Sequence, residues 1–168
     1  QQYNLTLQGR PIGWRAADTT GDPMNALGTA CQHLINSSIA GIVGPVHSEE
    51  ARIMAIFSKT IGIPVVSYAA TDPVLSDSSA YPTFYRVVPS DNTAALAIAQ
   101  LFLQFNWTSA IVIFQGDVYG TGGVKALDDT FTQLGLHVSQ MIVFDVVEEV
   151  VRGNLRSLLT SSAARVVI

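Results

Sequence analysis

Residues 40–77 read AGIVGPVHSEEARIMAIFSKTIGIPVVSYAATDPVLSD and hold two apolar runs separated by a helix-type segment. The first run, residues 39–43, ends at a Gly44-Pro45 break, and the second covers residues 64–67. This pattern is typical of two parallel strands joined by a crossover helix. The turns that follow the two strands then lie at the same edge of one sheet, where open α/β sheets bind their ligands. We therefore interpret this stretch as a ligand-binding edge.

The composition favours a sheet covered by helices and argues against several classes of protein. Of the 168 residues, 48% are hydrophobic and 13% are charged, which is about half the charged fraction of an average globular domain. Strands buried on both faces produce such a composition. The net charge of −4 and the lack of a basic stripe argue against nucleic acid as a partner. The most apolar segment, residues 94–105, is about half as long as a membrane-spanning helix, so a membrane anchor is expected only outside these residues.

Strand and helix patterns alternate along the chain, which predicts the α/β class with parallel, doubly wound sheets. An extended segment at residues 83–91 separates two such runs and has the character of a hinge between two lobes. We place lobe 1 at residues 1–88 and lobe 2 at residues 89–168, and we expect both to be incomplete. The expected strands are 12–17, 39–43, 64–67, 83–88, 110–114, 138–144 and 166–168, and the expected helices are 22–36, 48–62, 92–105, 124–134 and 154–162.

Further expectations concern the helices and one loop. Asp22 and Ser48 are expected to cap their helices, because their side chains accept hydrogen bonds from free N–H groups. Ile56 is expected on the core face of the second helix. The helix at 92–105 is apolar nearly all round, so we expect it to be buried. Residues 115–123 are rich in glycine and are expected to form a loop.

Motifs of enzyme chemistry do not fit the sequence. The segment GDVYGTGG at 116–123 suggests a dinucleotide-binding pattern, but glycine is then required at position 125, which is Lys125. The pattern G-x-G-x-x-G therefore fails. The sequence contains no phosphate-binding loop and no G-x-S-x-G motif, and its three histidines lack the spacing of metal ligands. We expect no enzyme activity, no cofactor and no metal.

Glycosylation sequons and a single cysteine bear on the location of the chain. Asn4, Asn36 and Asn106 each begin an N-x-[S/T] triplet, and such triplets indicate an extracellular location when they are used. Cys31 is the only cysteine in the sequence. It either packs as a small hydrophobic side chain or forms a disulfide with a partner outside these residues.

Five blocks in order carry a family resemblance: GIVGPVHSEEA, IPVVSYAATDPVLSD, YPTFYRVVPSD, FNWTSAIVIF and DVYGTGGVKAL. They resemble the ligand-binding region of cell-surface receptors with the type I periplasmic-binding-protein fold. The resemblance is closest to amino-acid-sensing class C G-protein-coupled receptors and glutamate-receptor-like channels. It implies two α/β lobes that close on a small ligand, an extracellular domain that dimerises through lobe 1, and membrane segments outside this chain. The alternative with the same fold is a soluble solute-binding protein for amino-acid transport.

The resemblance also implies a binding site for an α-amino acid. Ser48 matches the serine that meets the ligand carboxylate, and Thr71, with the backbone at Ala69, matches a second contact to the ligand. Asp91 matches the acid that takes the ammonium group, and Tyr119 matches the aromatic residue that covers the ligand on closure. A carboxylate at Ser48 is also physically reasonable, because a helix N-terminus favours an anion.

The chain departs from the family pattern directly after Ser48. Glu49 and Glu50 stand where amino-acid sensors tend to have small hydroxyl residues. A carboxylate in the first helical turn opposes a bound anion if it points inward.

Overall fold

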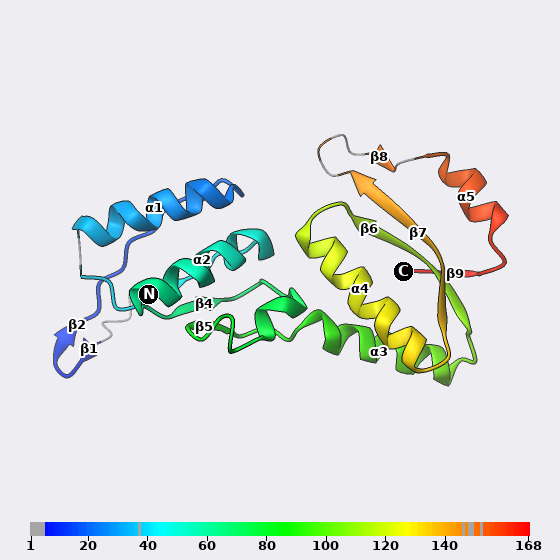
Figure 1. Cartoon of the computed structure of the whole chain (residues 1–168), viewed down its shortest axis with the longest axis horizontal. Coiled ribbons are helices and arrows are strands. Elements are labelled where there is room, and N and C mark those ends of the chain that lie inside the picture. The colour runs from blue at the N-terminus through cyan, green and yellow to red at the C-terminus, as the bar shows by residue number, and fades with distance from the viewer. Residues whose placement is uncertain (1–5, 37, 146, 148–149, 152) are drawn as a thin grey trace.

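A computed structural model describes residues 6–36, 38–145, 147, 150–151 and 153–168, and it shows two parallel sheets with helices packed on them (Figure 1). A short antiparallel hairpin precedes both sheets. The strands are β1 (Thr6–Leu7), β2 (Arg10–Pro11), β3 (Ile42–Val43), β4 (Val65–Ser67), β5 (Phe84–Arg86), β6 (Ser109–Gln115), β7 (His137–Asp145), β8 (Val150–Val151) and β9 (Val166–Val167). The helices are α1 (Pro23–Asn36), α2 (Ser48–Ile61), the 3-10 helix η1 (Pro73–Ser76), α3 (Asp91–Gln104), α4 (Val118–Gln133) and α5 (Leu155–Ser161).

The first sheet has the order β3-β4-β5, and all three strands are parallel. Its register pairs Ile42 with Val65 and Val65 with Phe84. Helix α2 packs on this sheet and α1 packs against α2, so the two helices lie side by side (Figure 1). The predicted strand–helix–strand unit at residues 40–77 is confirmed. The buried core of this part consists of Ala51, Ala55, Val65, Ala70, Leu75 and Phe84.

The second sheet has the order β8-β7-β6-β9, and β6 runs parallel to both β7 and β9. Strand β8 pairs antiparallel with β7. Helices α3 and α4 pack on one face, and α5 covers the other, where it contacts the Ile111 and Ile142 side chains. This sheet is therefore covered by helices on both faces, as its near-continuous apolar strands predict. The α/β class with parallel sheets is confirmed.

The helix boundaries follow local chemistry. Asp22 caps α1 as predicted: its Oδ1 accepts hydrogen bonds from the N–H groups of Met24 and Asn25, both at 2.8 Å. Helix α2 ends at Gly62, whose φ of 71° is a left-handed conformation that glycine adopts without steric cost.

Several expectations from the sequence are wrong. Residues 12–17 form no strand, because none of the described strands pairs with them and an unpaired strand leaves its backbone groups without partners. Helix α4 begins at Val118 and not at 124, because the Asp117 carboxylate accepts the N–H of Gly120 at 2.8 Å and starts the helix within the glycine-rich segment.

The core faces of two helices also differ from the prediction. Ile56 is 57% exposed, because α2 buries a different face, which includes Ala51, Met54 and Ala55. Helix α3 is not buried all round: it buries the stripe Ala95, Ala99 and Phe102 at helical spacing, while Leu96 remains half exposed. Mean apolarity predicted that α3 would be covered, but only one stripe of it faces α4 and β6.

The aromatic pair Phe102–Phe131 is expected to dominate the core between α3 and α4. The two rings lie 4.8 Å apart, and Phe131 is fully buried. Phe131→Ala should therefore lower the free energy of unfolding by about 3–5 kcal/mol, from lost burial and the cavity left behind. Urea denaturation followed by tryptophan fluorescence measures this loss, since Trp107 packs against Phe102. Leu103→Ala, at a 43% exposed position of α3, is the matched control, and equal losses for the two variants would contradict the assignment.

Candidate ligand-binding site

The loops that follow β3 and β4 are joined by one buried hydroxyl. Ser67 Oγ, at the end of β4, donates to the carbonyl of Pro45 at 2.7 Å and accepts the N–H of Ala70 at 3.0 Å. Ser48, the first residue of α2, lies three positions after Pro45. The carboxyl edge predicted from the sequence therefore forms, with the Ala69 segment shaped by Ser67.

The next segment brings Thr71 to the start of α3. The N–H of Asp91 donates to the carbonyl of Thr71 at 3.0 Å. Ser90 caps α3 by accepting the N–H of Asn92 at 3.3 Å, so the Asp91 side chain is not used as the cap. Two of the predicted site residues, Thr71 and Asp91, are thus in direct contact through their backbones.

The Asp91 carboxyl lies in a partly buried position that disfavours its charge. Burial is the main cause of a pKa raised above the ordinary value of 3.8, and the nearby charge of Asp72 adds to the increase. The Thr71 side chain beside it and the Arg86 charge oppose the increase without cancelling it. A cationic group placed on this carboxylate would supply the charge compensation that it lacks.

Three predicted site residues hold buried oxygens that lack a hydrogen-bond partner of good geometry among the described residues, although the Thr71 side chain lies close enough to Asp91 to lower its pKa. These atoms are Ser48 Oγ, Thr71 Oγ1 and Asp91 Oδ2. The expectation that Ser48 caps α2 is wrong: the N-cap is His47, and no side chain caps this helix end. The Ser48 hydroxyl is therefore free of helix capping. Buried polar atoms are almost always paired in folded proteins, so each of these oxygens indicates a missing partner.

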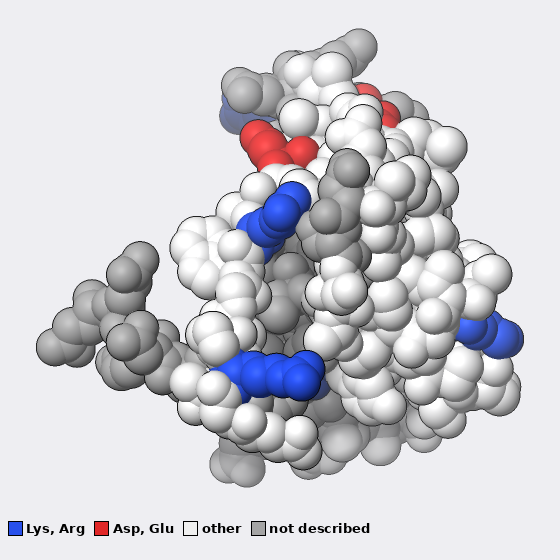
Figure 2. Space-filling model, turned by 90° about the vertical axis from the view of Figure 1, so that its left-hand side faces the viewer, with Lys and Arg blue, Asp and Glu red and all other residues white. Residues whose placement is uncertain are grey.

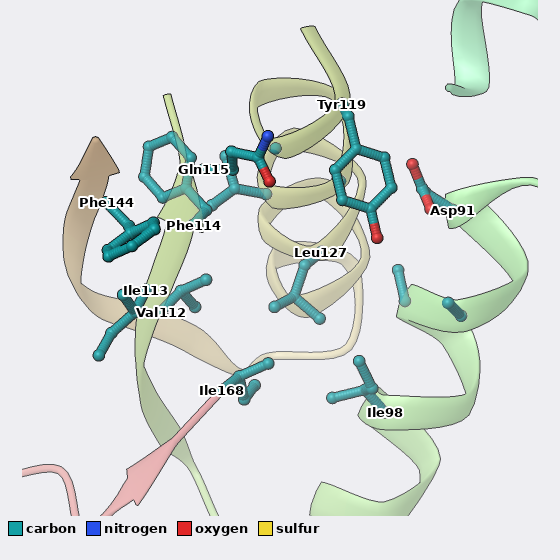
Figure 3. A pocket seen from close by; sticks show the side chains of 15 residues that line it. Asp91, Ile98, Val112, Ile113, Phe114, Gln115, Tyr119, Leu127, Phe144 and Ile168 are labelled. Carbon is teal, nitrogen blue, oxygen red and sulfur yellow. The ribbon is translucent and has the colours of Figure 1, made fainter. Parts of the chain in front are cut away.

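Tyr119 approaches the same region from α4. It is 50% exposed, and it lines a cavity of about 460 Å³ together with Asp91. Figure 3 shows the Tyr119 and Asp91 side chains side by side at one end of this cavity. The rest of the lining is mainly apolar and comes from α3, α4 and β6. Tyr119 and Asp91 therefore face the same cavity from α4 and α3.

A network missed in the sequence holds the loop between Ala70 and Ser76. The Asp72 carboxylate is fully buried and pairs with the Arg52 guanidinium, which raises the pKa of Arg52. Arg86 donates to the carbonyl of Asp72 at 2.9 Å and also bonds the Ser76 hydroxyl. Arg52 thus holds the Asp72 carboxylate and Arg86 holds the Asp72 backbone carbonyl, and these bonds fix the loop because hydrogen bonds that involve a charged group are stronger than neutral ones. The signal in the sequence was Arg86, a cation within an otherwise apolar strand.

The two glutamates after Ser48 differ in solvent exposure. Glu49 is exposed, whereas Glu50 is fully buried. Neither carboxylate oxygen of Glu50 has a hydrogen-bond partner among the described residues. Glu50 therefore places a buried carboxylate where amino-acid sensors tend to have a small hydroxyl residue. The Glu49 carboxylate points to solvent, where it does not oppose a bound anion.

The family comparison covers almost the whole chain. The family model described as "Receptor family ligand binding region" matches residues 3–168. The chain belongs to this family. Its parallel α/β architecture is that of a type I periplasmic-binding-protein-like fragment.

Three curated relatives are receptors by their printed names. The chain is 31% identical over 113 residues to "Glutamate receptor 3.7" of Arabidopsis thaliana, covering 67% of the chain and 12% of the relative. It is 31% identical over 115 residues to "Metabotropic glutamate receptor-like protein E" of Dictyostelium discoideum, covering 68% and 14%. It is 32% identical over 155 residues to "G-protein coupled receptor family C group 6 member A" of Carassius auratus, covering 83% and 17%. The chain thus spans less than a fifth of the length of these relatives.

Three further observations concern surface charge, helix length and candidate metal ligands. Lys and Arg side chains on the face seen in Figure 2 are separated from one another and form no continuous stripe. In the described part of the chain, no helix is long and apolar enough to cross a membrane. The same described residues contain no group of three His, Cys, Asp or Glu side chains that could hold a metal ion.

Glycine allows α4 to approach η1. A Cβ at Gly122 would lie 3.2 Å from Asp72 Oδ1 and 3.4 Å from Pro73, whereas the closest atom to a Cβ at Gly123 would be Asp91 Oδ2 at 3.8 Å. The Asp72 carboxylate is held by Arg52, so it gives way only at the cost of that contact. The contact between the two sheet regions therefore depends on glycine at 122.

Alanine at these two neighbouring positions makes a matched pair. Both changes replace glycine in the same helix, so each gains up to about 1 kcal/mol of helix propensity. Gly123→Ala should keep this gain in helix propensity and raise the melting temperature. In Gly122→Ala the close contact of the new Cβ with Asp72 should cancel the gain. Differential scanning fluorimetry of both variants measures the contrast. Equal increases in melting temperature would show that α4 does not pack closely on η1.

Proposed function

We propose that the chain is the extracellular ligand-binding region of a cell-surface receptor and that it binds an α-amino acid between two lobes, residues 1–88 and 89–168. The supporting observation is the set of three unpartnered buried oxygens at Ser48, Thr71 and Asp91. They come from three segments far apart in the sequence, and each occupies a position that the family resemblance assigns to the ligand. Glu50 and Gln140 also hold unpartnered buried oxygens, so the support comes from the coincidence of the three atoms with the positions that the family resemblance assigns to the ligand.

The groups of an α-amino acid match this arrangement. Its carboxylate would accept hydrogen bonds from the Ser48 and Thr71 hydroxyls and from free N–H groups at the start of α2, where the helix dipole favours an anion and the buried Glu50 carboxylate opposes one. Its ammonium group would pair with the Asp91 carboxylate, whose burial disfavours an uncompensated charge. Tyr119 would then cover the ligand from the α4 side.

Closure on the ligand would provide the signal. The predicted ligand contacts divide between the lobes, with Ser48 in lobe 1 and Tyr119 in lobe 2, so a ligand stabilises the arrangement in which both sides reach it. Helix α4 already lies against η1 through Gly122. The relatives named as receptors favour signalling over transport.

The hydroxyl contacts are tested by Ser48→Ala and Thr71→Ala in the full-length protein. Each change should weaken amino-acid binding by about 1–3 kcal/mol, the cost of leaving a buried partner unpaired. Isothermal titration calorimetry measures the loss, and Ser78→Ala, at an exposed position, is the control. If the variants lose the same affinity for the amine that lacks the carboxylate, neither hydroxyl binds the ligand carboxylate.

The Asp91 site predicts opposite pH trends for binding and stability. Because the pKa of Asp91 is raised in the folded, ligand-free protein, its carboxylate ionises at a higher pH than an ordinary aspartate. Affinity for the ligand ammonium should rise as the pH increases through that pKa and be lost as the pH falls. The stability of the ligand-free protein should change the other way, because a raised pKa favours the protonated folded state at low pH and this contribution is lost as the pH rises.

Asp91→Asn should remove both trends. The variant should lose amino-acid affinity at pH 7 and melt no lower than the native protein, since it removes a poorly compensated charge without changing the side-chain shape. Calorimetric titrations and thermal melts between pH 4 and 8 measure both quantities. A variant that binds the amino acid with native affinity would exclude Asp91 from the site.

A further inference from the structure

The end of α3 presents Asn106 to solvent in a fixed conformation. Asn106 has a φ of 55°, and its N–H donates to the carbonyl of Leu103 at 3.3 Å. The N–H of Trp107 donates to the carbonyl of Phe102 at 2.9 Å. These two bonds form a Schellman motif in which the left-handed position is held by asparagine instead of the more usual glycine.

Aromatic rings on both sides of Asn106 form a series from the core to the surface. Phe102 is buried, and Trp107 packs edge-on against it with ring centroids 5.3 Å apart. Phe105 stacks on Trp107 at 5.0 Å and an interplanar angle of 23°. The Schellman motif accounts for the contact between Trp107 and Phe102. It does not account for Phe105, which is 58% exposed.

Asn106 is also the first residue of the sequon Asn106-Trp107-Thr108. Both Asn106 and Thr108 are exposed. The other two sequons begin at Asn4, which lies outside the described residues, and at Asn36, whose following residue Ser37 lies outside them. Asn106 is thus the acceptor whose surroundings the structure describes, and exposed aromatic rings stand on both sides of it.

We propose that Asn106 carries an N-linked glycan and that the first sugar of this glycan packs on the exposed face of Phe105. In the transfer step the Asn106 side-chain nitrogen attacks the anomeric carbon of an oligosaccharide carried on a lipid diphosphate. A carbon–nitrogen bond forms, the bond from that carbon to the diphosphate breaks, and the amide loses one proton. The proposal rests on the extracellular location that the proposed function assigns to this chain.

The covalent bond of the glycan to Asn106 explains why a sugar would cover Phe105. The glycan is bonded to the residue directly after Phe105, so its first pyranose ring is held beside the exposed ring at high effective concentration. The C–H face of a pyranose is apolar and matches the flat face of an aromatic ring, while its hydroxyls remain in water. Trp107 stacks on one side of Phe105, and the sugar would cover the part of the ring that remains exposed.

The test uses full-length protein purified from cells that make only high-mannose glycans. One portion is trimmed with endoglycosidase H, which leaves a single sugar on each asparagine, and another is treated with peptide N-glycosidase F, which removes the glycan entirely. Hydroxyl-radical labelling with mass spectrometry then reports the exposure of Phe105. Labelling of Phe105 should be about two-fold lower in the intact and the trimmed protein than in the fully deglycosylated protein, since one ring face is covered. Tyr85, which is 56% exposed, should label equally in all three.

A variant separates the sugar from the asparagine. Thr108→Ala removes the sequon and retains Asn106 in its left-handed conformation, so it should label at Phe105 like the fully deglycosylated protein. An unmodified Asn106 in the purified full-length protein would overturn the proposal, and so would labelling of Phe105 that the glycan does not change. Amino-acid titration of the same samples tests the proposed function separately, because Phe105 and Asn106 do not belong to the ligand-binding site.

Discussion

The Ser67 hydroxyl connects the two loops on which the site depends. It is fully buried at the end of β4, where it donates to the Pro45 carbonyl and accepts the N–H groups of Ala69 and Ala70. One side chain thereby fixes the turn before α2 and the turn that leads to Thr71. Parallel strands bring such turns to one edge, but they do not set the distance between them. In this chain that distance follows from three hydrogen bonds to a single oxygen.

Electrostatics extends this arrangement towards α3 and α4. Asp72 lies between Arg52 and Arg86, and its backbone carbonyl and side chain are both used. The loop therefore presents a fixed surface to α4, which reaches it only because position 122 lacks a side chain. Gly120 is constrained for another reason: a Cβ there would lie 2.0 Å from the backbone oxygen of Gln115. These glycines serve close packing, and this is why a segment that looks like a flexible loop in the sequence folds as the first turns of a helix.

The sequence predicted the order of the elements well and their contacts poorly. Alternating apolar runs and caps such as Asp22 are local signals, and they gave the parallel α/β class and most of the helices. The strand at 12–17 failed because strand formation needs a partner, which local pattern does not supply. The Arg86–Asp72 bond joins residues whose separation in sequence carries no pattern, so spacing gave no indication of it. The proposed site residues came from a family resemblance, and the geometry adds that Thr71 and Asp91 are in contact.

The unpartnered oxygens link binding to conformational change. Two buried hydroxyls without partners, at Ser48 and Thr71, together cost roughly 2–6 kcal/mol, from about 1–3 kcal/mol for each. Opening the lobes would let water satisfy these groups, and closing them without a ligand would restore the cost. A ligand that supplies the missing partners removes the cost only in the closed arrangement, so its binding free energy differs between the two states. Such a difference is the requirement for a ligand to shift a conformational equilibrium. The same unsatisfied groups that support the proposed site would therefore also make closure depend on its occupation.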